Sequence, residues 1–94
     1  MASSASGFTA SGSRDEMFGK VGTALEAIDG VEIASRAQLL GVYDINYEGN
    51  NFLVRVSQAE AGALVSAVDP RGMPVSGASP TKLIAALRTA IGGN

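Results

Sequence analysis

The stretch YDINYEGNNFLVRV, residues 43–56, decides the fold. Apolar and polar side chains alternate from Tyr43 to Glu48, and they alternate again from Phe52 onward. A period of two is typical of a half-buried β-strand. Between the two runs, Gly49 and Asn50 can adopt the positive φ angles of a tight turn. The stretch therefore predicts a β-hairpin whose core-facing residues are Tyr43, Ile45, Tyr47, Phe52, Val54 and Val56.

The polar side chains of the first run also resemble the start of a calcium-binding loop. Asp44, Asn46, Glu48 and Gly49 match the first half of such a loop, but Arg55 stands where the bidentate glutamate belongs. Side chains on one face of a strand are about 6.5 to 7 Å apart, too far for three oxygens to meet at one ion. We expect a solvated strand face and no metal.

Further structure is predicted after the hairpin. ALVSAV, residues 63–68, is apolar at nearly every position and predicts a strand buried on both sides. DPRG, residues 69–72, has the composition of a type I turn. MPVSG, residues 73–77, is a candidate edge strand. Residues 79–91 predict a helix with Ser79 as its cap, Pro80 at its first position and Gly92-Gly93 as its stop.

The segments before the hairpin divide into three. Residues 1–13 are mostly Ser, Ala and Gly, and we expect them to be disordered. Ser13 and Glu16 have capping-box spacing and begin an amphipathic helix that Gly30 would end. Residues 31–40 suit either a short strand or an irregular connection. The buried stripe of the helix is expected to be Phe18, Val21, Leu25 and Ile28.

These elements predict a single two-layer α+β domain over residues 14–94. Its order is helix, three or four strands and helix, with an antiparallel meander sheet and both helices on one face. Such an arrangement leaves the opposite face of the sheet without cover.

The composition argues against most kinds of catalytic and ligand-binding site. The chain has no cysteine and no histidine, so it lacks thiolates and the usual acid/base group of neutral pH. The acids show no clustering, and neither Lys20 nor Lys82 stands in a nucleophile motif. Glycines do not follow a phosphate-binding spacing. We expect no catalytic residues, no cofactor, no small-molecule substrate and no enzyme activity.

Location follows from what the sequence lacks. No apolar run approaches the roughly 20 residues that a membrane-spanning helix needs. The first residues, MASSASGFTASGS, have neither the cationic start nor the apolar stretch of a secretory signal. A cytoplasmic location is therefore expected.

Nucleic-acid binding is the alternative function. Helix, three strands and helix is also the element order of double-stranded RNA-binding domains, and the second helix here stands where that family carries several lysines. The resemblance is one of order only, since this helix offers Lys82 and, nearly two turns later, Arg88. The net charge of −2 and a pI near 4.9 also disfavour phosphate contacts. The residues that would carry this function are Arg55, Arg71, Lys82 and Arg88.

Protein binding is the function that the sequence favours. A sheet face that stays partly apolar would be covered by a partner or by a second copy in a homodimer. The other possibility is a monomer with ordinary scattered apolar surface. The expected architecture is similar to that of small acidic secretion chaperones, which combine a helix–three strands–helix core with dimerisation. The partly apolar face would carry Leu53 and either Leu64 or Val65. The candidate interaction residues that we select are Leu53, Arg55 and Val65 on the sheet, with a rim of Glu48, Asn50 and Asn51 at the hairpin tip.

Overall fold

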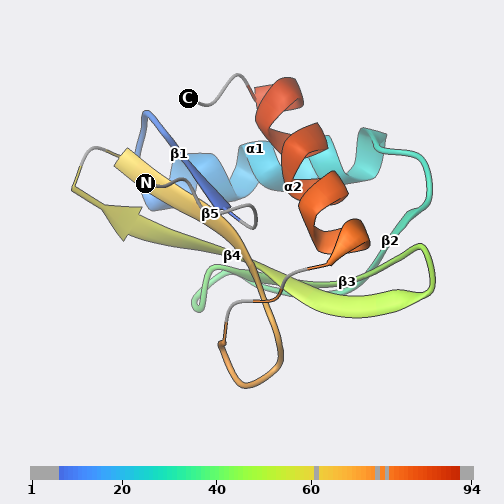
Figure 1. Ribbon diagram of the computed structural model, residues 1–94. Helices are drawn as coiled ribbons and strands as arrows, with labels where there is room; N and C mark the ends of the chain where they lie inside the picture. Colours follow the sequence, from blue (N-terminus) through green and yellow to red (C-terminus); the bar gives the residue numbers. More distant parts are fainter. Residues whose placement is uncertain (1–6, 61, 74, 76, 92–94) are drawn as a thin grey trace.

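The computed structural model describes residues 7–60, 62–73, 75 and 77–91. Five strands and two helices follow one another along the chain (Figure 1). In order they are β1 (Gly7–Ala10), α1 (Arg14–Ala27), β2 (Val31–Ala37), β3 (Val42–Tyr47), β4 (Asn50–Ala59), β5 (Gly62–Val68) and α2 (Ala78–Ile91).

The strands form one antiparallel sheet in the order β1-β5-β4-β3-β2. The last four strands make a meander, and β1 joins it beside β5. Because β1 and β2 lie at opposite edges, the helix that connects them, α1, must cross the sheet, and it contacts β2, β4 and β5 on the way. The second helix, α2, packs against α1, β1 and β5.

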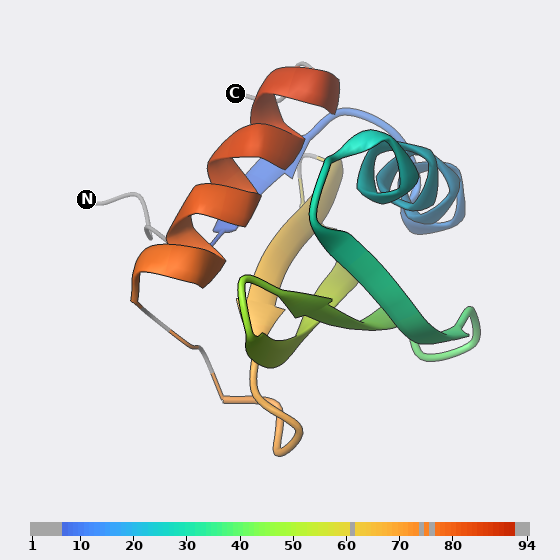
Figure 2. The same ribbon diagram turned by 90° about the vertical axis from the view of Figure 1, so that its right-hand side faces the viewer.

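Both helices lie on the same side of the twisted sheet (Figure 2). The predicted fold class, a two-layer α+β domain with an antiparallel meander and both helices on one face, is confirmed. The sheet has five strands rather than three or four. The core between the two layers contains fully buried side chains from every layer, among them Val21, Leu25, Ile45, Val54, Val65, Leu83 and Leu87.

The expected disorder of residues 1–13 is wrong for the part that the structure describes. Gly7–Ala10 forms β1, which pairs with β5. Phe8 lies opposite Val65 and Ala10 lies opposite Ala63, and both β1 side chains are 5% exposed. Composition averaged over thirteen residues concealed this short alternation of one aromatic and one small apolar residue. Residues 1–6 lie outside the described part of the chain.

Of the predicted helix ends, only the start of α1 is confirmed. The Glu16 amide donates to the Ser13 hydroxyl over 3.1 Å, which confirms the predicted start of α1. That helix ends at Ala27, before the expected stop at Gly30. The second helix begins at Ala78, so Ser79 lies inside the first turn and is not its cap, and Pro80 is not its first residue. The stop predicted at Gly92-Gly93 lies outside the described residues.

The remaining segments give mixed outcomes. Residues 31–37 form a strand, the first of the two alternatives, and a turn follows. The turn at residues 69–72 is confirmed, because the Gly72 amide donates to the Asp69 carbonyl over 2.8 Å. The fourth strand proposed for residues 73–77 does not form at Met73 or Val75, although the Val75 amide donates to the Ala67 carbonyl over 3.2 Å. Pro74 and Ser76 lie outside the described residues.

Candidate interaction surface

Both helices of the described residues pack on one face of the sheet, and we call the other face the open face. The register of the strands determines which side chains it carries, since residues directly opposite one another in an antiparallel pair point to the same side. On the three central strands these residues are Val42, Asp44 and Asn46 of β3, Asn51, Leu53, Arg55 and Ser57 of β4, and Leu64, Ser66 and Val68 of β5.

Aliphatic side chains run across this face. Leu64 is 37% exposed, while Leu53 and Val42 are half-buried although no helix packs on them. Arg55 stands among them and is exposed. The open face therefore combines accessible apolar surface with a charged group, which is the mixture found at interfaces that form and dissociate.

The structure brings together half of the predicted site residues. Leu53, Arg55 and Asn51 lie on neighbouring positions of β4 and point to the open face. Val65 does not: it lies opposite Val56 and is completely buried beneath the helices. Of the two alternatives on β5, Leu64 is the one on the open face. ALVSAV has no regular polar position, so the sequence could not show which residues face inward.

Glu48 and Asn50 point toward α2 rather than to the open face. The Glu48 carboxylate accepts from Lys82 Nζ over 2.7 Å and from the Ser79 hydroxyl over 3.1 Å. Asn50 Nδ2 donates to the same hydroxyl over 2.9 Å. The positive φ angles of the hairpin belong to Glu48 and Gly49, at 53° and 80°, and not to Gly49 and Asn50 as expected. This cluster joins the hairpin to the first turn of α2.

The two charged groups of this cluster, Glu48 and Lys82, shift each other's pKa. Hydrogen bonds from Lys82 and then from Ser79 lower the pKa of Glu48 below its ordinary value. The same pairing raises the pKa of Lys82. Both groups are therefore charged over a wider pH range than free side chains, and they act as a structural clasp between the β3–β4 hairpin and α2.

Asp44 and Asn46, the other polar residues of the calcium-like pattern, have a different partner. Asn51 Nδ2 donates to Asp44 Oδ1 over 2.7 Å and to Asn46 Oδ1 over 3.2 Å. The predicted hairpin is thus confirmed, with its polar side chains divided between the open face and α2. Within the described residues, acidic side chains do not gather in a group of three or more.

Sequence reasoning missed one exposed apolar feature, the pair Leu39 and Leu40 in the turn between β2 and β3. Leu39 is 93% exposed and Leu40 is 71% exposed. The turn is held firmly, because Arg14 Nη1 donates to the carbonyl of Leu39 over 3.4 Å and the Val56 amide donates to the Gly41 carbonyl over 2.6 Å. The sequence does contain a signal of this exposure. Two consecutive leucines stand before a glycine, and adjacent residues of an extended chain cannot both face one core.

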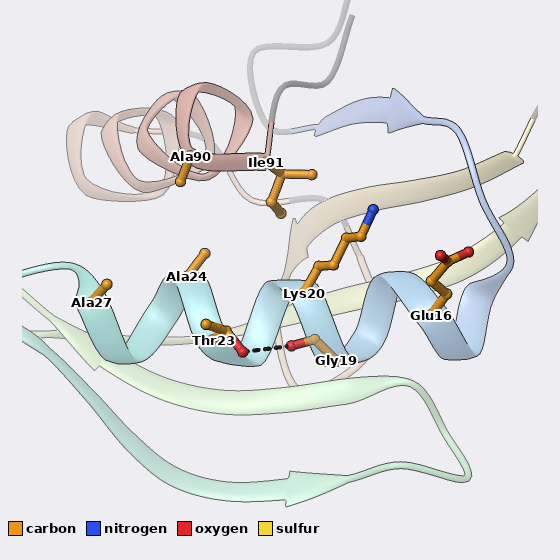
Figure 3. Close-up of a pocket in the computed structure, with 8 residues that line it drawn as sticks. All are labelled: Glu16, Gly19, Lys20, Thr23, Ala24, Ala27, Ala90 and Ile91. Atoms are coloured by element: carbon orange, nitrogen blue, oxygen red, sulfur yellow. Dashed lines mark hydrogen bonds between the residues drawn. The ribbon is translucent and has the colours of Figure 1, made fainter.

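A groove lies between the two helices on the opposite side of the molecule (Figure 3). Its volume is about 790 Å³. Small side chains form most of its wall, and Glu16 and Lys20 stand along one side. This lining offers apolar contact area but few polar groups that converge on one point. The apolar and small lining residues are Gly19, Ala24, Ala27, Ala90 and Ile91.

The four cations of the nucleic-acid alternative do not share a surface. Arg55 is on the open face, whereas Lys82 and Arg88 belong to α2 on the other side of the sheet. Two of the four are paired with acids, Lys82 with Glu48 over 2.7 Å and Arg71 with Asp69 over 3.3 Å. Among the described residues, neither helix combines the length and apolar character that a membrane crossing needs.

Comparison with protein-family models, with curated proteins and with solved structures gives no match.

Proposed function

We propose that this protein is a small non-catalytic interaction domain that binds another protein chain through the open face of its sheet. The observation that carries the proposal is the one-sided arrangement of the helices. It leaves Leu53, Val42 and Leu64 on a face that neither helix of the described chain covers, although Val68 at the end of that face is only 5% exposed. Apolar side chains that share an open sheet face on a small domain support a role in binding.

Two further features support the proposal. The turn with Leu39 and Leu40 adjoins the end of the open face where Ala37 and Val42 pair, so it extends the apolar surface beyond the strands. The side chains within the described residues that titrate away from their ordinary pKa are engaged in structural contacts, such as Glu48 with Lys82. A regulator, an inhibitor or a chaperone-like adaptor has these properties.

Capture of partners from a cell extract tests this proposal when it is combined with a substitution on the open face. Leu53→Lys places a charge at the centre of the face and should abolish binding of the partners that the wild-type chain captures. Ala85→Lys, at an exposed position of α2, is the matched control and should bind them all.

The two variants should be folded to the same extent, which circular dichroism can check. The proposal is wrong if the captured proteins remain bound to Leu53→Lys while Ala85→Lys loses them, because the binding surface would then lie on the helices.

A further inference from the structure

The open face has a square of four residues at its centre. Val42 of β3 lies opposite Arg55 of β4, and Asp44 lies opposite Leu53. Neighbouring strands are about 4.8 Å apart and alternate residues along a strand about 6.8 Å, so opposite corners are about 8 Å apart. One diagonal joins the two charged residues, and the other joins the two aliphatic residues.

The two charged corners are available to an external partner. Arg14, Arg36, Arg71 and Lys82 each pair with a carboxylate of the same chain. Within the part of the chain that the structure describes, Arg55 has no such partner and its side chain is exposed. Asp44 accepts a hydrogen bond from the neutral Asn51 side chain and forms no ion pair with a cation of the described residues. A guanidinium and a carboxylate thus stand close together without neutralising each other.

We propose that the open face binds the same face of a second copy of this chain, about a two-fold axis that places each Arg55 against Asp44 of the second copy. This inference rests on the proposed function and names the partner of that same surface. A face-to-face dimer has its axis in the plane between the two sheets, and the surface must complement itself.

Only one direction of that axis matches the charges. An axis along the strands places Arg55 on Val42 of the second copy, and an axis across the strands places Arg55 on Leu53. An axis near the Val42–Leu53 diagonal exchanges the charged corners, so that two Arg55–Asp44 pairs form. It also brings Val42 against Val42 and Leu53 against Leu53 at the centre of the interface. The square is therefore complementary to itself in charge and in polarity.

The surroundings of the square permit close approach. Ser57 and Ser66 lie beside Arg55 on the open face, and Ala37 and Ser35 of β2 lie opposite Val42 and Asp44. These short side chains would let the two sheets approach to the usual distance of about 10 Å. Five strands of about six residues cover roughly 24 by 20 Å. Two copies would then bury about 1,000 Å² together, the lower limit of specific interfaces, so the dimer should be weak and reversible.

The edges of the sheet are less suited to self-association. The edge strand β2 has a bulge between Ile33 and Ser35 and carries the charged residues Glu32 and Arg36. Bulges and charges are the features that prevent strand-to-strand pairing at an edge. The opposite edge, β1, is only four residues long. The open face is consequently the surface on which a second copy fits.

Charge reversal tests the proposed pairing. Arg55→Glu gives a face with two acids and Asp44→Arg gives a face with two guanidinium groups, so each variant alone repels itself. Each should dimerise at least about tenfold more weakly than the wild-type chain, since close interfacial charge pairs contribute about 1.5 kcal/mol or more. An equimolar mixture of the two variants restores both pairs and should recover the dimer. Lys20→Glu, on α1, is the control and should dimerise like the wild-type chain.

Sedimentation velocity over a series of concentrations measures these equilibria, and circular dichroism confirms that each variant is folded. If a variant does not fold, Arg55→Ser and Asp44→Asn remove the charges singly and should each weaken the dimer. Recovery of the dimer in the mixture supports the proposal. A wild-type chain that stays monomeric at millimolar concentration overturns it, and so does a dimer that charge reversal leaves unchanged. The capture experiment would still decide whether the open face binds a different protein.

Discussion

Two glycines of α1 have opposite surroundings. Gly22 is buried, and a methyl group there would overlap the hydroxyl of Tyr43 and lie 3.0 Å from its Cζ atom. That hydroxyl donates to the Phe18 carbonyl over 2.8 Å, and the two rings stack with their centroids 4.3 Å apart. Gly19 is exposed, and no heavy atom would lie within 4 Å of its methyl group. Another side chain therefore packs closely against Gly22 but not against Gly19.

The same substitution should therefore have opposite effects at the two positions. Gly19→Ala should raise the free energy of unfolding by about 0.5 to 1 kcal/mol, because alanine is the better helix former and nothing obstructs it. Gly22→Ala should lower it by about 1 to 3 kcal/mol, since the new methyl group displaces a hydrogen-bonded and stacked tyrosine. Urea unfolding of the two variants measures both values. Stabilisation by both would show that Tyr43 can move away from α1.

At the scale of elements, the clasp between the β3–β4 hairpin and α2 depends on pH. Because the pKa of Glu48 is lower in the folded chain, its contribution to stability is present above the unfolded-state pKa and is lost as the pH falls through the folded-state pKa. The pKa of Lys82 is raised, so its contribution is lost only when the pH rises through that raised value. The clasp acts in the window between these two values.

Glu48→Gln removes the charge while it keeps most of the shape. The variant should be less stable than the wild-type chain at neutral pH, and the difference should disappear as the pH falls through the lowered pKa of Glu48. Thermal unfolding at several pH values measures this, with Asp29→Asn, at an exposed position, as the control. A difference between the Glu48→Gln and wild-type stabilities that stays constant from neutral to acid pH would contradict the role given to the carboxylate.

The sequence predicted correctly those strands whose polar residues show which side faces water and which side faces the core. Asp44, Asn46 and Arg55 show which side of β3 and β4 faces water, and the positions of both strands agree with the prediction. On β5 the polar residues are too few to show which side faces the core, so Val65 was assigned to the wrong face of the sheet. Strand β1 was missed because it is stabilised by contacts with β5, more than fifty residues away in the sequence, rather than by its own composition.

The candidate site was predictable to a similar degree. Alternation within β4 placed Leu53, Arg55 and Asn51 on one face, as the structure does. The sequence could not show that the side chains of Glu48 and Asn50 point toward α2, since this depends on where α2 begins relative to the hairpin. Local patterns thus indicate which residues share a strand face, whereas contacts between a turn and a distant helix depend on how the layers are assembled.

At the scale of the whole molecule, one architectural fact determines the functional conclusion. Two helices cover one side of a five-stranded sheet, and the other side has aliphatic residues around an aspartate and an arginine that pairs with no carboxylate of the described residues. The net charge of −2 is small, so repulsion between copies is weak. A face of this kind can bind a second chain without any change in the fold.

The most direct test of this account is a comparison of amide chemical shifts at low and high protein concentration. We expect shifts to change on the open face, at Val42, Asp44, Leu53 and Arg55, and to stay constant along α1 and α2. Changes confined to the helices, around the groove at Lys20 and Ile91, would contradict the account, as would spectra that do not change with concentration.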